Sequence, residues 1–225
     1  MRARPEAVLW DFDGTLVDTE PIWAQTEAEM LADHDVVWGE DMMRSLIGQS
    51  AAITTRQMAE AIGRPDRHEE IHDELHRRIA DQLRRDGLPF LPGALELLEE
   101  AADDGVPAAV VTASNGTIMA AAVDLLPPAV QFVVHGDDVA RSKPHPDPYL
   151  LAMERLGVSS DGSIALEDSV PGTASALAAG AFVYAVPVLA QLESHPRMVI
   201  SSDGLASTTW PDLLGIWHEA KGNRR

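Results

Sequence analysis

The sequence contains no cysteine, so disulfide bonds, thiolate nucleophiles and zinc sites with cysteine ligands are all excluded. Basic residues are also scarce: 17 Lys and Arg stand against 36 Asp and Glu, and the net charge is −19. Such a chain is not expected to bind nucleic acid or an anionic membrane. It repels an anionic substrate at long range, so a phosphate site needs a local positive group. The lack of cysteine also fits the cytoplasmic location that we expect.

Long apolar segments are missing as well. Residues 1–6 are not followed by the apolar core of a signal peptide, because two aspartates come too soon. Residues 169–192 carry no charge, but prolines and glycines interrupt them and alanine dominates over leucine. We predict a short helix over 173–179 and a strand over 182–186 there, and no membrane span. The hydrophobic content of 45% is ordinary for a globular protein.

Several short apolar runs predict the buried strands of a parallel sheet. They do not alternate between apolar and polar residues, which is typical of strands covered on both faces. The runs are 7–12, 108–112, 132–135, 163–166, 182–186 and 198–200. Helical patterns over 93–104, 117–125, 148–156 and 171–179 lie between them. Because strands and helices alternate, we predict an α/β fold with a doubly wound, Rossmann-like parallel sheet.

Residues 19–88 interrupt this alternation, because they contain helical patterns only. Helices are predicted over 21–32, 51–62 and 66–85, and in the last one an apolar residue recurs every four positions from Ile71 to Leu83. We therefore predict two units. Residues 1–18 and 89–225 form the α/β core domain, and residues 19–88 form an inserted helical domain.

The first predicted strand ends in Asp11-Phe12-Asp13-Gly14-Thr15. The carboxyl ends of parallel strands face the ligand crevice, so Asp11 is expected where chemistry takes place. Two carboxylates two residues apart repel each other, and a bound divalent cation would remove that cost. Gly14 permits a tight turn, and we expect the Thr15 hydroxyl to tie the loop back to the backbone. A polar strand end that caps a turn is the structural alternative, although the segment by itself already favours a functional role.

The second strand is followed by Thr112-Ala113-Ser114-Asn115-Gly116. These residues offer hydroxyl and backbone N–H donors just before a helix, which suits a phosphate oxygen. A plain N-cap by Ser114 or Asn115 is the structural alternative.

Charged residues follow two further strands. Lys143 stands in a proline-stiffened loop, where it can neutralise both Asp11 and an incoming phosphate, although an exposed loop lysine is the simpler interpretation. Glu167-Asp168-Ser169 supplies a second carboxylate pair that can complete an oxygen-only Mg²⁺ site. Four strand ends of one sheet thus offer a nucleophile, hydroxyl donors, a lysine and metal ligands.

With these residues in order, the chain resembles the haloacid dehalogenase-like superfamily of phosphotransferases. Its four motifs are matched by Asp11/Asp13/Thr15, Thr112, Lys143 and Glu167/Asp168. The resemblance covers essentially the whole chain, because residues 19–88 lie where one subfamily carries a small helical cap domain. Asp18-Thr19-Glu20-Pro21-Ile22-Trp23 and Leu166-Glu167-Asp168-Ser169-Val170-Pro171-Gly172 are similar to the branch of sugar-phosphate phosphatases and β-phosphoglucomutase.

The resemblance implies a Mg²⁺-dependent phosphatase that acts on a small phosphorylated metabolite, expected to be a sugar or polyol phosphate. Asp11 would attack phosphorus and form an aspartyl phosphate. Asp13 would protonate the leaving oxygen and then deprotonate the attacking water. A dehalogenase needs no such acid for a halide, so the second aspartate argues against dehalogenation.

The resemblance also implies the binding residues. Mg²⁺ would be held by Asp11, the backbone carbonyl of Asp13, Glu167 and Asp168, and the phosphoryl oxygens by Thr112, the N–H of Ala113 and Lys143. Substrate contacts are expected at Glu20, Trp23, Gly48, Gln49, Ser50, Ser114 and Asn115. With a small-molecule substrate as its partner, the chain is expected to be a monomer.

Two other functions are open. A phosphomutase of the β-phosphoglucomutase type would return the phosphate to another hydroxyl of the same sugar. That relative carries a histidine where this chain has Trp23, and basic residues around the cap glycine where this chain has Ile47-Gly48-Gln49-Ser50-Ala51. These departures favour hydrolysis. A non-catalytic protein that binds phosphorylated metabolites would be expected to lack Asp11 or Asp13.

One further motif points to zinc. His68-Glu69-Glu70-Ile71-His72 satisfies the His-Glu-x-x-His pattern of zinc proteases, and His76 continues the spacing. The simpler interpretation is a solvated flank beside the apolar stripe of an acidic, arginine-rich helix. No zinc-protease continuation follows His72, so we predict no zinc site here.

Overall fold

The computed structural model describes residues 4–39, 51–187 and 190–222 of the chain. In this part of the chain, six strands form one sheet in which all neighbours are parallel. Their order is β3-β2-β1-β4-β5-β6, so the doubly wound parallel sheet is confirmed. The strands are β1 (Ala7–Trp10), β2 (Ala108–Val111), β3 (Val130–Val134), β4 (Ser163–Glu167), β5 (Phe182–Ala185) and β6 (Met198–Ile200).

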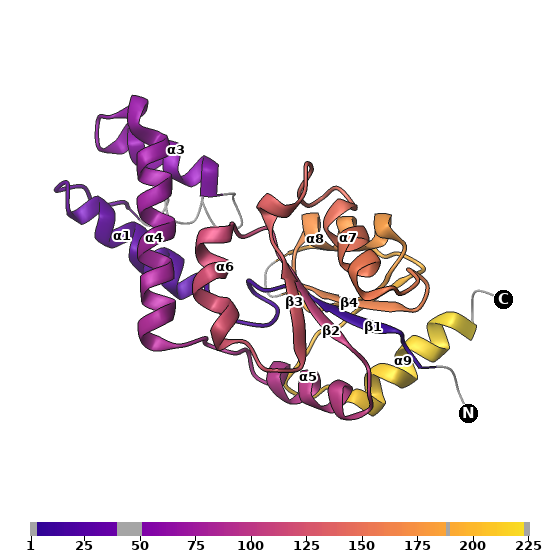
Figure 1. Cartoon of the computed structure of the whole chain (residues 1–225). Coiled ribbons are helices and arrows are strands. Elements are labelled where there is room, and N and C mark those ends of the chain that lie inside the picture. The colour runs from indigo at the N-terminus through magenta and orange to yellow at the C-terminus, as the bar shows by residue number, and fades with distance from the viewer. Residues whose placement is uncertain (1–3, 40–50, 188–189, 223–225) are drawn as a thin grey trace.

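Helices cover both faces of the sheet (Figure 1). Because side chains alternate along a strand, β1 directs Val8 and Trp10 to one face and Ala7 and Leu9 to the other. Helices α5, α6 and α9 pack on the first face, and α7 and α8 on the second. Their bounds are α5 (Ala94–Asp103), α6 (Gly116–Ala122), α7 (Asp147–Leu156), α8 (Val170–Ala179) and α9 (Trp210–Gly222). Short 3₁₀ helices span Val123–Leu125 and Gly136–Asp138.

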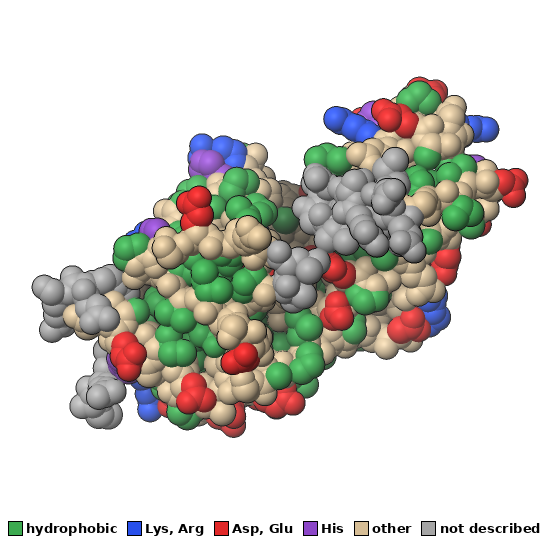
Figure 2. Space-filling view, turned by 180° about the vertical axis from the view of Figure 1, so that it is seen from behind, with side chains coloured by type: hydrophobic (Ala, Val, Ile, Leu, Met, Phe, Trp, Pro, Cys, Tyr) green, Lys and Arg blue, Asp and Glu red, His purple; other side chains and the backbone are tan. Residues whose placement is uncertain are grey.

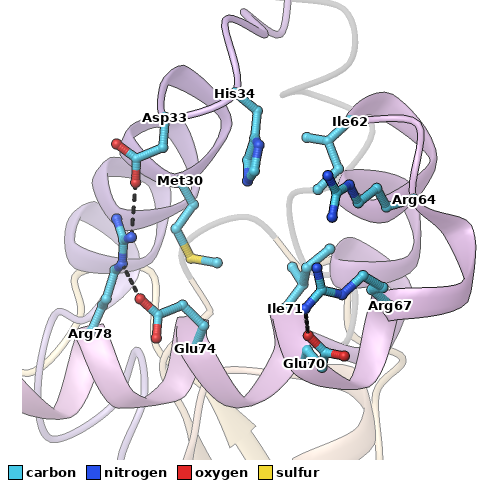
Figure 3. Close-up of a pocket in the computed structure, with 10 residues that line it drawn as sticks. All are labelled: Met30, Asp33, His34, Ile62, Arg64, Arg67, Glu70, Ile71, Glu74 and Arg78. Atoms are coloured by element: carbon cyan, nitrogen blue, oxygen red, sulfur yellow. Dashed lines mark hydrogen bonds and ion pairs between the residues drawn. The ribbon is translucent and has the colours of Figure 1, made fainter.

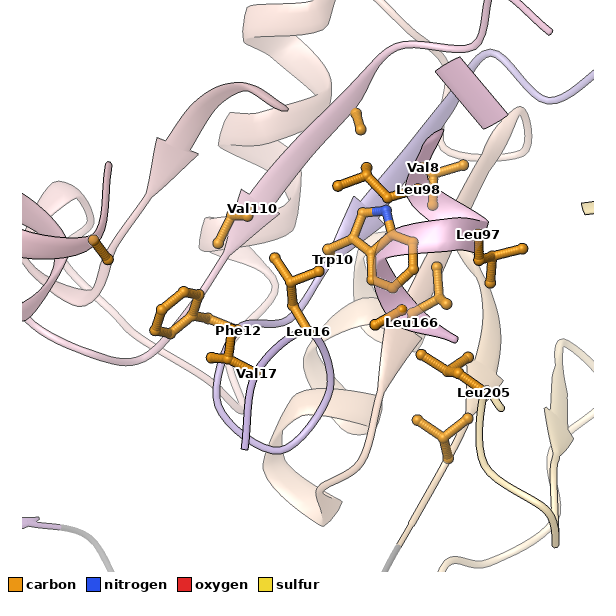
Figure 4. Close-up of a cluster of buried hydrophobic side chains, with 14 of the residues drawn as sticks. Val8, Trp10, Phe12, Leu16, Val17, Leu97, Leu98, Val110, Leu166 and Leu205 are labelled. Carbon is orange, nitrogen blue, oxygen red and sulfur yellow. The ribbon is translucent and has the colours of Figure 1, made fainter. Parts of the chain in front are cut away.

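The larger buried side chains gather on the first face. Figure 4 shows Trp10, Phe12 and Leu16 packed with apolar side chains of α5 and β4. Burial of one such side chain contributes about 1.5–3 kcal/mol. Helix α9 was not predicted, although Trp210 and Trp217 stand seven residues apart on it and are both buried in this cluster.

The described part of residues 19–88 is helical, as predicted. It consists of α1 (Glu20–Ala32), α3 (Ala51–Ala61), α4 (His68–Asp86) and a 3₁₀ turn over Pro65–Arg67. Leu75, Ile79 and Leu83 of α4 are fully buried, and they belong to the same apolar cluster as Ile118 of α6. The helical insert therefore packs on α6, at one side of the core (Figure 1).

The two connections between insert and core run side by side. Val17 and Phe90 form an antiparallel bridge. The N–H of Asp18 donates to the carbonyl of Pro89 at 2.8 Å, and the N–H of Leu91 donates to the carbonyl of Leu16 at 3.0 Å. This pairing holds the entry and the exit of the insert together, next to the end of β1.

The surface is acidic, and no helix within the described ranges is long and apolar enough to cross a membrane. Figure 2 shows acidic side chains spread over one face of both the core and the insert, as the net charge of −19 leads one to expect. The uncharged segment after Ser169 contains α8 and β5, as predicted.

Candidate active site

Three carboxylates meet at the carboxyl ends of β1 and β4. Asp11 follows β1, Glu167 is the last residue of β4, and Asp168 comes next. The two strands are neighbours, and the N–H of Asp11 donates to the carbonyl of Leu166 at 3.0 Å. One carboxylate oxygen from each of the three residues lies within 4.8 Å of the other two. The residues given by the first and last motifs thus come together in space, where the strand order of the sheet reverses.

Lys143 lies between two of these carboxylates. Its Nζ is 2.6 Å from Oδ1 of Asp11 and 2.7 Å from Oε1 of Glu167. Only 4% of the lysine side chain is exposed, and none of the Glu167 side chain. Lys143 is therefore not an exposed loop residue, and its charge is directed at the carboxylates.

Burial and crowding alter the protonation of this group. Burial raises the pKa of Asp11 well above its ordinary value; the Lys143 charge opposes this, and the neighbouring carboxylates add to it. Burial and the Glu167 charge raise the pKa of Asp168 to about 7. Burial alone would lower the pKa of Lys143, but Asp11 and Glu167 outweigh it and raise that pKa. One lysine does not neutralise three carboxylates, so a bound divalent cation would reduce the electrostatic repulsion that remains among them.

The carboxylate of Asp13 bonds to a separate set of hydroxyl groups. Its Oδ1 accepts a hydrogen bond from Thr19 Oγ1 at 2.6 Å. Its Oδ2 accepts one from Ser114 Oγ at 2.6 Å and one from Thr112 Oγ1 at 3.3 Å. The N–H of Ser114 donates in turn to Thr112 Oγ1 at 2.9 Å. Asp13 is thus tied both to the loop after β2 and to the start of the insert.

Thr19 was not among the predicted site residues. It stands at the N-cap of α1 but makes no capping hydrogen bond, and its hydroxyl goes to Asp13 instead. In the sequence, a threonine before a helix indicates an ordinary N-cap. Only the fold shows that this hydroxyl has another acceptor.

The loop after β2 divides its polar groups between the helix and Asp13. Asn115 is the N-cap of α6, because its Oδ1 accepts a hydrogen bond from the N–H of Ile118 at 3.2 Å. Ser114 bonds to Asp13. The backbone of Ala113 packs against Gly136: a Cβ atom added to residue 136 would lie 2.6 Å from the carbonyl oxygen of Ala113. The N-cap alternative therefore holds for Asn115.

The turn after β1 requires glycine but does not use the Thr15 hydroxyl. Gly14 has φ +81°, and a Cβ atom at this position would overlap Oδ2 of Asp168. The predicted hydrogen bond from Thr15 was wrong: its side chain is fully buried, and Oγ1 has no partner in the described part of the chain. The backbone closes the turn instead, since the N–H of Gly14 donates to the carbonyl of Val17 at 2.8 Å.

The predicted substrate residues of the insert are described only in part. Glu20 is the first residue of α1 and is exposed. Trp23 is partly buried. The remaining three predictions lie outside the described residues: Gly48, Gln49 and Ser50.

His76 of α4 packs inside the helical insert. His76 is buried, its Nδ1 lies 2.7 Å from the carbonyl oxygen of His72, and its ring meets Trp23 edge-on with centroids 5.4 Å apart. Burial lowers the pKa of His76. The prediction of a solvated flank was wrong for this residue, because its ring fills the space between α1 and α4.

A separate pocket of about 180 Å³ lies within the insert (Figure 3). Its charged side chains largely pair with one another: Arg78 contacts Asp33 at 2.8 Å and Glu74 at 2.7 Å, and Arg67 contacts Glu70. None of the predicted site residues that the structure describes lines it. The carboxylates at the sheet edge, and not this pocket, form the candidate active site.

Tyr149 of α7 completes the surroundings of Glu167. Its hydroxyl donates to Oε1 of Glu167 at 2.6 Å, the residue is fully buried, and Nζ of Lys143 lies 5.3 Å from the ring centroid. Burial and the Glu167 charge raise the pKa of Tyr149 well above its ordinary value, so the phenol stays protonated. Sequence reasoning missed this residue, because a tyrosine in a helix after proline indicates only a core aromatic.

Comparisons with known proteins agree with this arrangement. A family model described as haloacid dehalogenase-like hydrolase matches residues 8–186. Hexitol phosphatase A of Escherichia coli (strain K12) is 30% identical over 184 residues, which are 81% of this chain and 83% of that protein. Phosphorylated carbohydrates phosphatase of Thermotoga maritima is 29% identical, over 78% of this chain and 82% of that protein. The crystal structure of CbbY from Rhodobacter sphaeroides in complex with phosphate is 27% identical and has a TM-score of 0.72, over 90% of this chain and 96% of that chain.

Proposed function

The chain belongs to the haloacid dehalogenase-like hydrolases, and we propose that it hydrolyses a sugar or polyol phosphate with Mg²⁺, through an aspartyl phosphate on Asp11. In general terms, the protein is a phosphoric monoester hydrolase that acts on phosphorylated metabolites. The proposed roles of Asp11 and Mg²⁺ rest on one observation: Asp11 and Lys143 form a buried ion pair beside two further carboxylates.

In the first step, a carboxylate oxygen of Asp11 attacks phosphorus, and the bond from phosphorus to the substrate oxygen breaks. Asp13 gives its proton to that oxygen, so the alcohol leaves neutral. In the second step, water attacks the phosphoryl group, Asp13 takes a proton from the water, and the bond to Asp11 breaks. Inorganic phosphate leaves, and both aspartates return to their starting states.

Lys143 has two tasks in this scheme. Its ammonium group holds the Asp11 carboxylate in one orientation before attack, since Nζ and Oδ1 are 2.6 Å apart. It also offsets the negative charge that a phosphoryl group brings to an acidic protein. Thr112 and the N–H of Ala113 would bind the remaining phosphoryl oxygens.

The donor set suits Mg²⁺. Asp11, Glu167 and Asp168 offer carboxylate oxygens only, and this hard cation prefers oxygen ligands. With the backbone carbonyl of Asp13, they would hold the ion next to the nucleophile. When bound, Mg²⁺ supplies positive charge that stabilises the transferring phosphoryl group.

We propose that residues 19–88 form a cap domain that acts as a lid. Thr19 at the start of α1 is bonded to Asp13, so a movement of the insert changes the surroundings of the proposed acid. The paired segments around Val17 and Phe90 are short, and a hinge would lie on the insert side of this pairing. Closure of the lid would exclude bulk water and bring Trp23 and its neighbours towards the substrate.

A phosphomutase of the β-phosphoglucomutase type is the second candidate, and it is not better supported. The curated relatives described above are phosphatases. Trp23, in place of a histidine, also favours transfer of the phosphoryl group to water.

The proposal is tested by phosphate release from a panel of phosphorylated sugars, polyols and nucleotides with Mg²⁺. We expect turnover to be fastest with a sugar or polyol phosphate. Conversion of a hexose 1-phosphate into its 6-phosphate without phosphate release would establish the mutase instead. Absence of both reactions across the panel would contradict the proposed substrate class.

A further inference from the structure

We propose that Tyr149 is a positioning residue of the metal site, which acts by fixing the carboxylate of Glu167. This inference rests on the proposed function, because it takes Glu167 as a Mg²⁺ ligand. Glu167 Oε1 accepts two hydrogen bonds, from the Tyr149 hydroxyl at 2.6 Å and from Lys143 Nζ at 2.7 Å. Its Oε2 accepts a longer one from Ser169 Oγ at 3.3 Å.

The two donors on Oε1 come from different elements. Tyr149 belongs to the first turn of α7, packed on the second face of the sheet, and Lys143 belongs to the loop that precedes this helix. Together they restrain rotation of the carboxylate about its last bond. A ligand fixed in this way loses little conformational freedom when a cation binds.

The tyrosine hydroxyl matters because the lysine is shared. Nζ of Lys143 contacts Asp11 at 2.6 Å as well as Glu167. Tyr149 is a neutral donor that serves Glu167 without adding charge. Without its hydroxyl, Oε1 of Glu167 would keep only the ammonium group that Asp11 also needs. Loss of the hydroxyl would therefore disturb two proposed metal ligands.

The hydroxyl can be separated from the packing of the ring. Tyr149→Phe keeps the apolar ring that packs with Ala152 and Met153 and removes only the donor. A matched control exists, because the chain has two tyrosines. Tyr184 of β5 is also buried, and its hydroxyl is 3.0 Å from Thr208 Oγ1. Tyr184→Phe thus removes a buried tyrosine hydroxyl away from the carboxylates.

The experiment is calorimetric titration of the substrate-free protein with Mg²⁺. Removal of a group that orients a metal ligand typically weakens metal binding about 10- to 100-fold. We expect this increase in Kd for Tyr149→Phe and an unchanged Kd for Tyr184→Phe. In steady-state assays, the KM for Mg²⁺ should rise in Tyr149→Phe, and kcat should recover at saturating Mg²⁺.

A double-mutant cycle tests whether Tyr149 acts through Glu167. In a Glu167→Gln background, removal of the Tyr149 hydroxyl should weaken Mg²⁺ binding much less than in the wild type. Equal, additive losses in both backgrounds would overturn the positioning role. So would a Tyr149→Phe protein that binds Mg²⁺ like the wild type.

Should Tyr149→Phe fail to fold, the intact chain still tests the inference. Replacement of both tyrosines by 3-fluorotyrosine gives two ¹⁹F signals, which Tyr184→Phe assigns. The Tyr149 signal should shift with Mg²⁺ along the calorimetric binding curve, and the Tyr184 signal should not. An unmoved Tyr149 signal at saturating Mg²⁺ overturns the inference. If the wild type itself binds no Mg²⁺, the metal-dependent function fails, and the inference fails with it.

Discussion

Gly172 leaves the space that the carboxylate of Glu167 occupies. A Cβ atom on residue 172 would overlap Oε2 of Glu167. Gly172 lies in the first turn of α8, whose N-cap Ser169 accepts a hydrogen bond from the N–H of Gly172 at 3.1 Å. Glycine is therefore required at position 172 because the residue contacts the candidate active site, and not because of the backbone conformation of the helix.

We expect Gly172→Ala to weaken Mg²⁺ binding and to lower the melting temperature. Alanine in a helix is normally stabilising by about 0.5–1 kcal/mol over glycine, so a loss would identify the clash with Glu167 as the cause. Gly215→Ala in α9 is the control, since its Cβ would meet nothing within 4 Å. Thermal unfolding should show a gain for Gly215→Ala and a loss for Gly172→Ala. A gain for both would contradict the packing described here.

Asp11→Asn should abolish phosphatase turnover and leave the fold intact. The substitution keeps the size of the side chain but removes the charge that is proposed to attack phosphorus. Loss of a nucleophile normally lowers kcat by orders of magnitude. Phosphate release gives the rate, and circular dichroism checks the fold. A variant that keeps more than about a tenth of the wild-type rate would argue against covalent catalysis by Asp11.

Removal of divalent cations should abolish activity, and addition of Mg²⁺ should raise the melting temperature. Three carboxylates within 4.8 Å repel one another, and an ion that binds only the folded chain stabilises it by mass action. Activity that persists after thorough chelation would contradict the metal requirement. Ca²⁺ should bind but inhibit, because its larger coordination shell would misplace the phosphate.

Thr19→Val should reduce kcat more than KM, because it removes the hydrogen bond of 2.6 Å to Asp13 and keeps the shape of the side chain. Thr19→Ser retains the hydroxyl and should restore most of the rate. Equal loss in the valine and serine variants would assign Thr19 to packing alone.

Glu27→Gln should stabilise the protein above neutral pH. Glu27 of α1 has no hydrogen-bond or ion-pair partner in the described ranges, and burial raises its pKa from 4.5 to about 7. A carboxyl group whose folded pKa is raised contributes its full stability below its unfolded pKa of 4.5, and that contribution is lost progressively as the pH rises from there through the folded pKa of about 7. Allowing for partial exposure, the ionised group costs about 1–2 kcal/mol at pH 8.

Urea unfolding with chelator present measures this difference. The advantage of the glutamine variant over the wild type should be largest at pH 8 and should be much smaller at pH 5, close to the unfolded pKa of 4.5. Glu29→Gln, at an exposed position on the same helix, serves as the control for replacing a glutamate of α1 by glutamine. An advantage of Glu27→Gln that is the same at both pH values would exclude ionisation as its cause.

The sequence by itself determined the sheet and the polar residues at its edge. Buried parallel strands are continuous apolar runs, so β1 and β4 were evident from composition, and Asp11 and Glu167 follow from where those runs end. The helices of the insert were equally evident, since the stripe from Ile71 to Leu83 has a helical period. Helix α9 was missed, although its tryptophans have a helical spacing.

Only the tertiary structure decided which partner each polar group has. Thr15 was expected to bond and is buried with no hydrogen-bond partner among the described residues, while Thr19, for which no role was predicted, bonds to Asp13. The Tyr149 hydroxyl reaches Glu167, which lies 18 residues further along the chain. Periodicity reports which face of an element is apolar. It carries no information on where the tip of a side chain ends once helices and strands from distant parts of the chain have packed together, and hydrogen bonds depend on that position to a few tenths of an ångström.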